Sequence, residues 1–187
     1  MATVTTPIET ESEGLYEVVD GQVMEKDVGY PQLLGASELM RALILFDPQE
    51  RCGWVVSEML FELRSDTQLA RRPDLAFVSY ERWPRDRAIE QRSTWPVVPD
   101  LVVEFISPTD INTHQRRKRA EYFKAGVQFI WEIDSGDSET AHSALVYEPT
   151  GKVQTVGLND DLDGGHVIPG FRVRLGSLFP PIKIIEE

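Results

Sequence analysis

Apolar residues along this chain fall into short runs separated by turn residues, and only two longer segments repeat at helical spacing. Residues 15–19 and 22–24 flank Asp20-Gly21, which predicts a two-residue hairpin because Asp-Gly supplies the positive φ angles of a type I′ turn. Residues 1–14 have no apolar period, so we expect them to form a mobile tail. A first helix is expected over residues 31–46, where Pro31 suits the first turn.

The middle of the chain carries the strongest strand patterns. Residues 53–57 and 59–63 are expected strands, and residues 75–78 and 101–106 are apolar almost throughout, as in central strands buried on both faces. A second helix is expected over residues 112–125 with Gly126 as its stop, followed by a strand over residues 127–133. Strand, helix and strand of these lengths predict a βαβ crossover. Together with hairpins near the end of the chain, this predicts an α/β fold, a mixed β-sheet flanked by two helices.

Composition limits the class of protein. With 187 residues and 41% hydrophobic positions, residues 15–187 are expected to form a single domain. One cysteine, Cys52, excludes a disulfide framework and, with an N-terminus lacking a basic and apolar leader, favours a reducing, cytoplasmic location. No apolar stretch approaches the ~20 residues that a membrane span needs, so no membrane partner is expected.

Charge is unevenly distributed. The net charge of −12 argues against binding of nucleic acid, which Lys and Arg dominate. Residues 71–124, however, carry 11 basic and 8 acidic residues, a local net charge of +3. This middle third is therefore where a polyanion is expected to bind.

Glu104 is the most informative residue, because it interrupts an apolar strand where an unpaired carboxylate costs several kcal/mol. Asp74 opens the other apolar strand, and if the two strands are neighbours their carboxylates can meet and hold Mg²⁺ with water and phosphate. In the alternative interpretation, Glu104 pairs with a buried arginine and Asp74 only caps a turn. Lys118 shares a helical stripe with Ile111, Tyr122 and Ala125 that should face the sheet, so its ammonium can reach the carboxylates. Alternatively, its side chain extends past Tyr122 to water.

Several segments with these residues occur together in a fixed order: residues 16–21, 72–78 and 99–108, then Lys118 and Tyr122, then residues 125–127, 130–131 and Asp134. In these segments the chain resembles the Uma-two family of restriction endonucleases, a branch of the PD-(D/E)XK nuclease superfamily. The resemblance implies a restriction-endonuclease-like fold with Asp74 and Glu104 as metal ligands. A strict E-x-K motif would place lysine at position 106, which is Ile106 here. The family's lysine lies on the following helix, where Lys118 matches.

The resemblance implies a metal-dependent endonuclease that hydrolyses phosphodiester bonds of nucleic acid, with DNA as the expected partner. Mg²⁺, or Mn²⁺ in its place, would polarise the phosphate while Lys118 orients the attacking water or stabilises developing charge. Glu17 and Glu58 lie in similar segments and are candidate accessory ligands, although exposed glutamates are common. The candidates for contacts to flanking phosphates, each of which can equally be plain solvated charge, are Arg71, Arg72, Arg116, Arg117 and Arg119.

Two other interpretations stay open. The chain can be a non-catalytic interaction or dimerisation module that keeps a nuclease-like fold, which the net charge of −12 favours. It can also be a structural protein in which Glu104 and Lys118 form a buried ion pair without a metal. A homodimer is suggested by apolar residues near the C-terminus, for which core packing is the alternative: Phe171, Leu178, Phe179 and Ile182.

Overall fold

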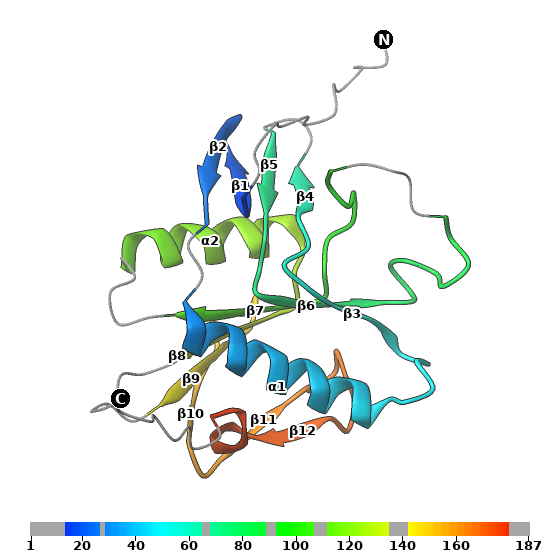
Figure 1. Ribbon diagram of the computed structural model, residues 1–187, viewed down its shortest axis with the longest axis vertical. Helices are drawn as coiled ribbons and strands as arrows, with labels where there is room; N and C mark the ends of the chain where they lie inside the picture. Colours follow the sequence, from blue (N-terminus) through cyan, green and yellow to red (C-terminus); the bar gives the residue numbers. More distant parts are fainter. Residues whose placement is uncertain are drawn as a thin grey trace, which may run out of the picture.

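The computed structural model describes residues 14–26, 29–64, 68–88, 93–106, 112–134 and 142–179. Within these ranges the chain forms two α-helices and three β-sheets (Figure 1). The expected tail lies outside the described residues apart from Gly14, as does Ile182, and a single domain over residues 15–187 stays a prediction.

A six-stranded mixed sheet forms the centre of the structure, in the order β10-β9-β8-β7-β6-β3. Its strands are β3 (Gly53–Ser57), β6 (Leu75–Ser79), β7 (Leu101–Ile106), β8 (Phe129–Asp134), β9 (Ser143–Tyr147) and β10 (Val153–Gly157). Only the β7–β8 pair among them is parallel, and α2 (Asn112–Ala125) connects the two strands. This confirms the predicted βαβ crossover and the mixed α/β class.

Two smaller sheets complete the described part of the chain. A four-stranded sheet has the order β2-β1-β5-β4, built from β1 (Tyr16–Val19), β2 (Gln22–Glu25), β4 (Phe61–Arg64) and β5 (Leu69–Arg71). A two-stranded sheet pairs β11 (Asp161–Asp163) with β12 (Arg172–Arg174), and a 3-10 helix, η1 (Leu175–Leu178), follows. The four-stranded sheet lies at the same end of the molecule as α2 (Figure 1).

Local sequence signals correctly predicted the boundaries of both helices and the first turn to within one residue. The first helix, α1 (Tyr30–Phe46), starts one residue before the prediction, and α2 matches it, with Gly126 at φ 109° as the stop. Asp20 and Gly21 have φ angles of 52° and 76°, as a type I′ turn requires.

Two predicted strands begin later than expected, and β5 was not predicted. The strand predicted over residues 59–63 begins at Phe61, because Glu58 at φ 50° interrupts the extended chain. The strand predicted from Val127 begins at Phe129, because the Val127 N–H donates back to Tyr122 O at the helix end (3.1 Å).

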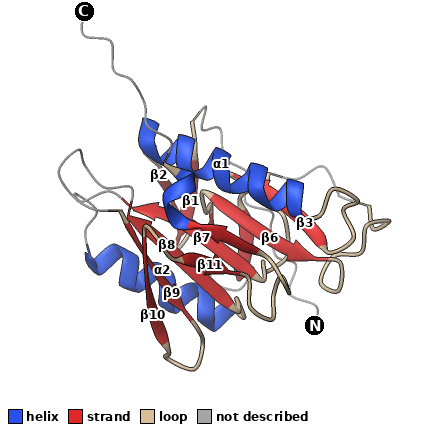
Figure 2. Ribbon diagram, turned by 90° about the horizontal axis from the view of Figure 1, so that it is seen from below, coloured by secondary structure: helices blue, strands red, loops and turns tan. Residues whose placement is uncertain are grey.

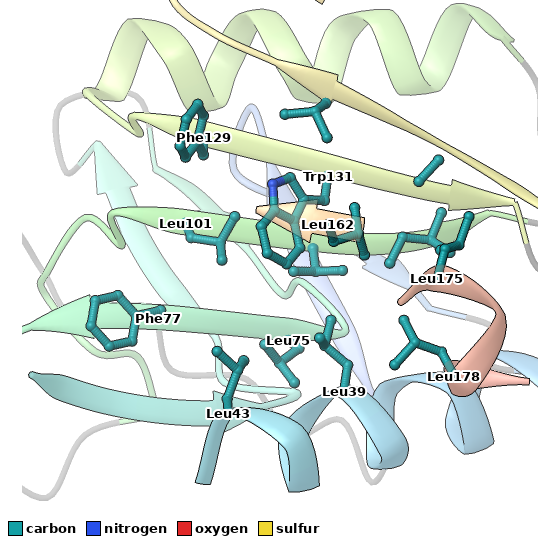
Figure 3. Packing of buried hydrophobic residues seen from close by; sticks show 14 of the residues in the cluster. Leu39, Leu43, Leu75, Phe77, Leu101, Phe129, Trp131, Leu162, Leu175 and Leu178 are labelled. Carbon is teal, nitrogen blue, oxygen red and sulfur yellow. The ribbon is translucent and has the colours of Figure 1, made fainter. Parts of the chain in front are cut away.

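The two helices cover opposite faces of the central sheet (Figure 2). On the α1 face, Leu39 and Leu43 pack with Leu75 of β6, and Leu178 of η1 closes the same cluster (Figure 3). On the α2 face, Tyr122 belongs to a second cluster with Val102 of β7 and its neighbours. Because side chains alternate along a strand, Leu101, Val103 and Phe105 face α1, whereas Val102 and Glu104 face α2.

Burial corrects one expectation from the sequence. Phe171 and Leu178, which suggested a homodimer surface, are each 1% exposed and belong to the core on the α1 face, and Phe179 packs against that core. Their apolar character is therefore explained by folding of this chain. It gives no argument for a dimer.

Candidate active site

A row of acidic residues crosses the sheet on the α2 face. The β3–β6 register pairs Ser57 with Leu75, so the next position places Glu58 beside Asp74, whose carbonyl accepts the Glu58 N–H (3.3 Å). The β6–β7 register pairs Leu75 with Val103, which places Asp74 across from Glu104. The parallel β7–β8 register then pairs Glu104 with Glu132. Two of these carboxylates lie in β7 and β8 and two lie one residue beyond β3 and β6, so the four form one row across adjacent strands.

Asp74 is 6% exposed, and both of its carboxylate oxygens have partners. Oδ2 accepts the main-chain N–H of Phe105 (2.5 Å), and Oδ1 accepts Lys26 Nζ (2.6 Å). The first bond ties Asp74 to the strand of Glu104. The expectation that the two carboxylates come from neighbouring strands is confirmed.

Lys26 also donates to Glu58 Oε2 (2.7 Å), so one ammonium bridges two members of the row. Glu58 has a left-handed backbone, which is uncommon for a non-glycine residue, and its carbonyl accepts an Arg72 guanidinium N–H. Burial raises the pKa of Glu58, and the charge of Lys26 opposes this effect only in part. Burial opposes the charge on Lys26, but Asp74, Glu104 and Glu58 outweigh it, and its pKa is raised.

Glu104 is 5% exposed and is held by two residues of α2. Tyr122 donates its hydroxyl to Oε1 (2.8 Å), and Lys118 Nζ lies 3.5 Å from Oε2. Burial raises the pKa of Glu104 to about 7, with Asp74 adding to the effect and Lys118 opposing it. Of the four carboxylate oxygens of Asp74 and Glu104, Glu104 Oε2 therefore has the longest hydrogen-bond contact.

Lys118 reaches the sheet face as its helical position predicted, and its side chain is 15% exposed. Its ammonium lies 3.1 Å from Glu17 Oε1 as well as near Glu104. Burial disfavours the charge, but the two carboxylates outweigh burial and raise the pKa of Lys118. Lys118 is therefore a fixed positive charge beside Glu104, which excludes the alternative of a side chain directed to water.

Glu17 is buried among positive charges. It accepts bonds from Arg71 Nη1 (2.6 Å) and from the Arg72 main-chain N–H (3.1 Å), in addition to the contact with Lys118. Burial would raise the pKa of Glu17, but Lys118 and Arg71 outweigh it and the pKa is lowered. With both oxygens engaged by cations and a main-chain donor, Glu17 is placed to orient Lys118.

Positions of the candidate phosphate-binding arginines differ. Arg71 is 6% exposed and pairs with Glu17 and Glu121, so it is a buried structural residue, and not the phosphate contact that its sequence suggested. Arg72 donates to the carbonyls of Tyr16 and Glu58. Arg117 pairs with Asp20 and Glu121 on the surface, Arg119 pairs with the buried Glu132, and Arg116 is exposed.

The structure thus brings together Asp74, Glu104 and Lys118 and adds residues that sequence patterns missed. Lys26 follows a hairpin strand and has nothing unusual in its local pattern, so no sequence signal marked it. Tyr122 was predicted to face the sheet, but its hydrogen bond to Glu104 was not. Glu132 lies in an apolar strand as Glu104 does, and the same reasoning would have selected it.

The donor set fits a cation held by two carboxylates. Among the described residues, no three His, Cys, Asp or Glu side chains form a group that could hold a metal ion. Two carboxylates completed by water and phosphate is a usual arrangement for Mg²⁺, and Asp74 and Glu104 are suited to it by their placement. A separate cavity of about 740 Å³ between the β9–β10 and β11–β12 hairpins is lined by polar residues such as Lys152, Asp160 and Arg172, and contains none of the acidic row.

The protein is thus of the mixed α/β class, with a pair of carboxylates at two adjacent central strands and a lysine on the crossover helix between β7 and β8. The fold is similar to the crystal structure of a putative nuclease belonging to DUF820 from Anabaena variabilis ATCC 29413, with a TM-score of 0.74. The two chains are 19% identical, and the match covers 91% of this chain and 93% of the other. A search among curated proteins found no significant match.

The family follows from the sequence itself. The model of the Uma2 family, described as putative restriction endonuclease, matches residues 6–176. The chain therefore belongs to the Uma2 family, as the resemblance of its motifs predicted. Within the described residues, neither helix combines the length and apolarity needed to cross a bilayer.

Proposed function

We propose that this protein is a metal-dependent endonuclease that hydrolyses phosphodiester bonds, with DNA as its substrate. The observation that carries the proposal is the placement of Asp74 across from Glu104, with Lys118 Nζ held between Glu104 and Glu17. Membership of a nuclease family supports the same reaction class. Action on nucleic acid and a single, exposed and free Cys52 are both consistent with a cytoplasmic location.

In this proposal Asp74 and Glu104 hold Mg²⁺ or Mn²⁺. When bound, the cation neutralises charge on the scissile phosphate and makes a coordinated water more acidic. The Phe105 N–H orients Asp74, and the Tyr122 hydroxyl orients Glu104, so both ligands are set before a cation arrives. Lys118 orients the attacking water or stabilises charge that develops on the phosphoryl oxygens, which a compact ammonium does well.

The negative net charge of the chain does not extend to the surface of α2. Arg116, Arg117 and Lys124 are exposed on α2, so the surface of this helix carries a local positive charge. An acidic protein with one basic region binds phosphate best at low ionic strength. The proposal therefore includes a strong loss of activity as salt rises.

A second candidate is a non-catalytic interaction module, and one observation favours it: the Lys26 ammonium pairs with both Asp74 and Glu58, so the chain itself supplies a cation to these carboxylates. The experiment that separates the two is cleavage of single- and double-stranded DNA and RNA with Mg²⁺ or Mn²⁺ at low salt. The endonuclease proposal expects cleavage by the wild type and its loss in both Asp74→Asn and Glu104→Gln. Failure of the wild type to cut any of these substrates would favour the interaction module.

A further inference from the structure

Lys26 is bound to Asp74, one of the two residues proposed above to hold a divalent cation. Its ammonium lies 2.6 Å from Asp74 Oδ1 and 2.7 Å from Glu58 Oε2, and its side chain is only 10% exposed. We propose that Lys26 is a tethered counter-cation, which leaves Asp74 when a divalent metal binds there. This inference rests on the metal site of the proposed function and adds a residue that controls its occupancy.

The two cations would compete for Asp74. Its Oδ2 accepts the Phe105 N–H at 2.5 Å and its Oδ1 accepts the Lys26 ammonium at 2.6 Å, so Oδ1 is the oxygen on which a metal would meet Lys26. Metal–oxygen distances for Mg²⁺ are about 2.1 Å, which would place the metal close beside the ammonium. Like charges at such a separation in a partly buried site repel each other strongly. This repulsion favours withdrawal of Lys26 from Oδ1 when a metal binds there.

Of the two lysines at the row, Lys26 is the one suited to exchange. Lys118 has an anchor outside the row, Glu17, which is itself held by the buried Arg71. Within the described part of the chain, in contrast, the ion-pair partners of Lys26 are Asp74 and Glu58, which both belong to the row. A metal that takes over Asp74 removes one of these two anchors, whereas the Glu17 anchor of Lys118 is unaffected.

Lys26 also explains how the metal-free site tolerates its negative charge. Adjacent carboxylates on three strands would repel one another if nothing neutralised them, and Lys26 supplies a positive charge within hydrogen-bond distance of two of them. The metal must compete with this internal cation, so the wild type should bind metal more weakly than a protein without Lys26.

Covalent labelling of the wild-type protein tests the displacement directly. Full-length protein is treated with an amine-acylating reagent in chelator or in saturating Mn²⁺, and modification of each lysine is measured by peptide mass spectrometry. Lys26 should be protected in chelator and become several-fold more reactive with Mn²⁺. Lys118, anchored by Glu17, and Lys152, whose side chain is 65% exposed, are internal controls whose labelling should not rise. Unchanged or lower labelling of Lys26 at saturating Mn²⁺ overturns the inference.

A substitution tests the competition. Lys26→Met keeps the apolar stem and removes the charge, and calorimetry should show Mn²⁺ affinity increased by about tenfold or more, a change of about 1.4 kcal/mol or more. Lys152→Met, at a surface ion pair with Glu148, is the matched control and should leave affinity unchanged. Equal or weaker binding by Lys26→Met would contradict the exchange while leaving the endonuclease proposal intact. Absence of Mn²⁺ binding in both wild type and Lys26→Met would reject the metal site itself, and this inference with it. The labelling result stands even where Lys26→Met does not fold.

Discussion

Asp74 and Glu104 lie opposite each other on neighbouring antiparallel strands, one position beyond the pair formed by Leu75 and Val103. The main-chain N–H of Phe105, the residue after Glu104, donates to Asp74 Oδ2 at 2.5 Å. This hydrogen bond couples the position of the Asp74 carboxylate to the strand that carries Glu104. Each of the two carboxylates has its own hydrogen-bond donor, which fixes its orientation in the folded chain.

Metal should stabilise the wild type through Glu104. Binding to the native state raises stability by mass action, about 2.7 kcal/mol at a ligand concentration one hundred times Kd. Thermal unfolding in millimolar Mg²⁺ or Mn²⁺ should therefore show a higher Tm than in chelator, and Glu104→Gln should lose most of this shift.

Glu148→Gln is the matched control, because Glu148 lies in a surface ion pair away from the row and its loss should leave the metal-induced shift intact. Equal shifts for wild type and Glu104→Gln would mean that the cation binds only to the acidic surface.

Turnover should depend on Lys118. If its ammonium acts on the water or on the phosphoryl oxygens, Lys118→Ala should lower turnover by about 10²–10³-fold, the loss seen when one electrostatic donor to a transition state is removed. Mn²⁺ binding should persist, because Asp74 and Glu104 remain. Lys152→Ala, which removes a surface ion pair with Glu148 away from the acidic row, is the control and should cut at the wild-type rate. Equal turnover for Lys118→Ala and wild type would remove Lys118 from the reaction.

Arg117 should matter much less than Lys118. Its guanidinium is half exposed and pairs with Asp20 and Glu121, so it is at most a charge that attracts phosphate. Arg117→Ala should weaken substrate binding slightly, and the salt dependence of binding should become shallower. Measurement of KM over a salt series checks this, and a large fall in kcat would contradict it.

Stability of the metal-free protein should depend on pH through Glu104. Its pKa is raised to about 7 from an ordinary value of 4.5, mainly by burial, so the folded state retains this proton where the unfolded state has lost it. The stability from that proton is complete below the unfolded pKa and is lost as the pH rises through the folded one. The charged and titratable groups that act on Glu104 are Asp74, Lys118, Lys26, Glu17 and Tyr122.

The measurement is urea unfolding in chelator between about pH 5 and pH 8, for wild type and Glu104→Gln. Wild type should lose stability relative to Glu104→Gln as the pH rises, because only the wild type has a carboxylate to ionise at this position. A constant difference across the range would show that Glu104 keeps an ordinary pKa.

Glu17 should act as a positioning residue for Lys118. Glu17→Gln weakens the contacts with Lys118 and Arg71, and a loss of about 1–3 kcal/mol in the free energy of unfolding is expected for a buried charged hydrogen-bond partner. Turnover should fall as well, because Lys118 is no longer held in place. The informative measurement is a double-mutant cycle: in the Lys118→Ala background, Glu17→Gln should change turnover little. Additive losses would show that Glu17 acts only on stability.

Features with a local cause could be predicted from sequence. Asp20-Gly21 specified its turn and Gly126 ended its helix, because backbone conformation depends on the residue itself. The helical stripe of Lys118 and Tyr122 followed from helix geometry, and the apolar run around Glu104 marked a central strand. Glu58 shows where this reasoning failed, because its left-handed backbone separates β3 from β4 without a glycine.

Patterns along the chain were therefore enough to predict the helices, the central strands and the need of Glu104 for a partner, because these features depend on neighbours within a few residues. Which ion pairs form depends on the tertiary structure. Lys26 binds Asp74 from 48 residues away, and Arg71 pairs with Glu121 across 50 residues. Such pairs depend on strand register and on how separate sheets pack, and no local period encodes them. For this reason Asp74 and Glu104, the proposed metal ligands, could be selected from the sequence, whereas Lys26, the proposed competitor of the metal, could not.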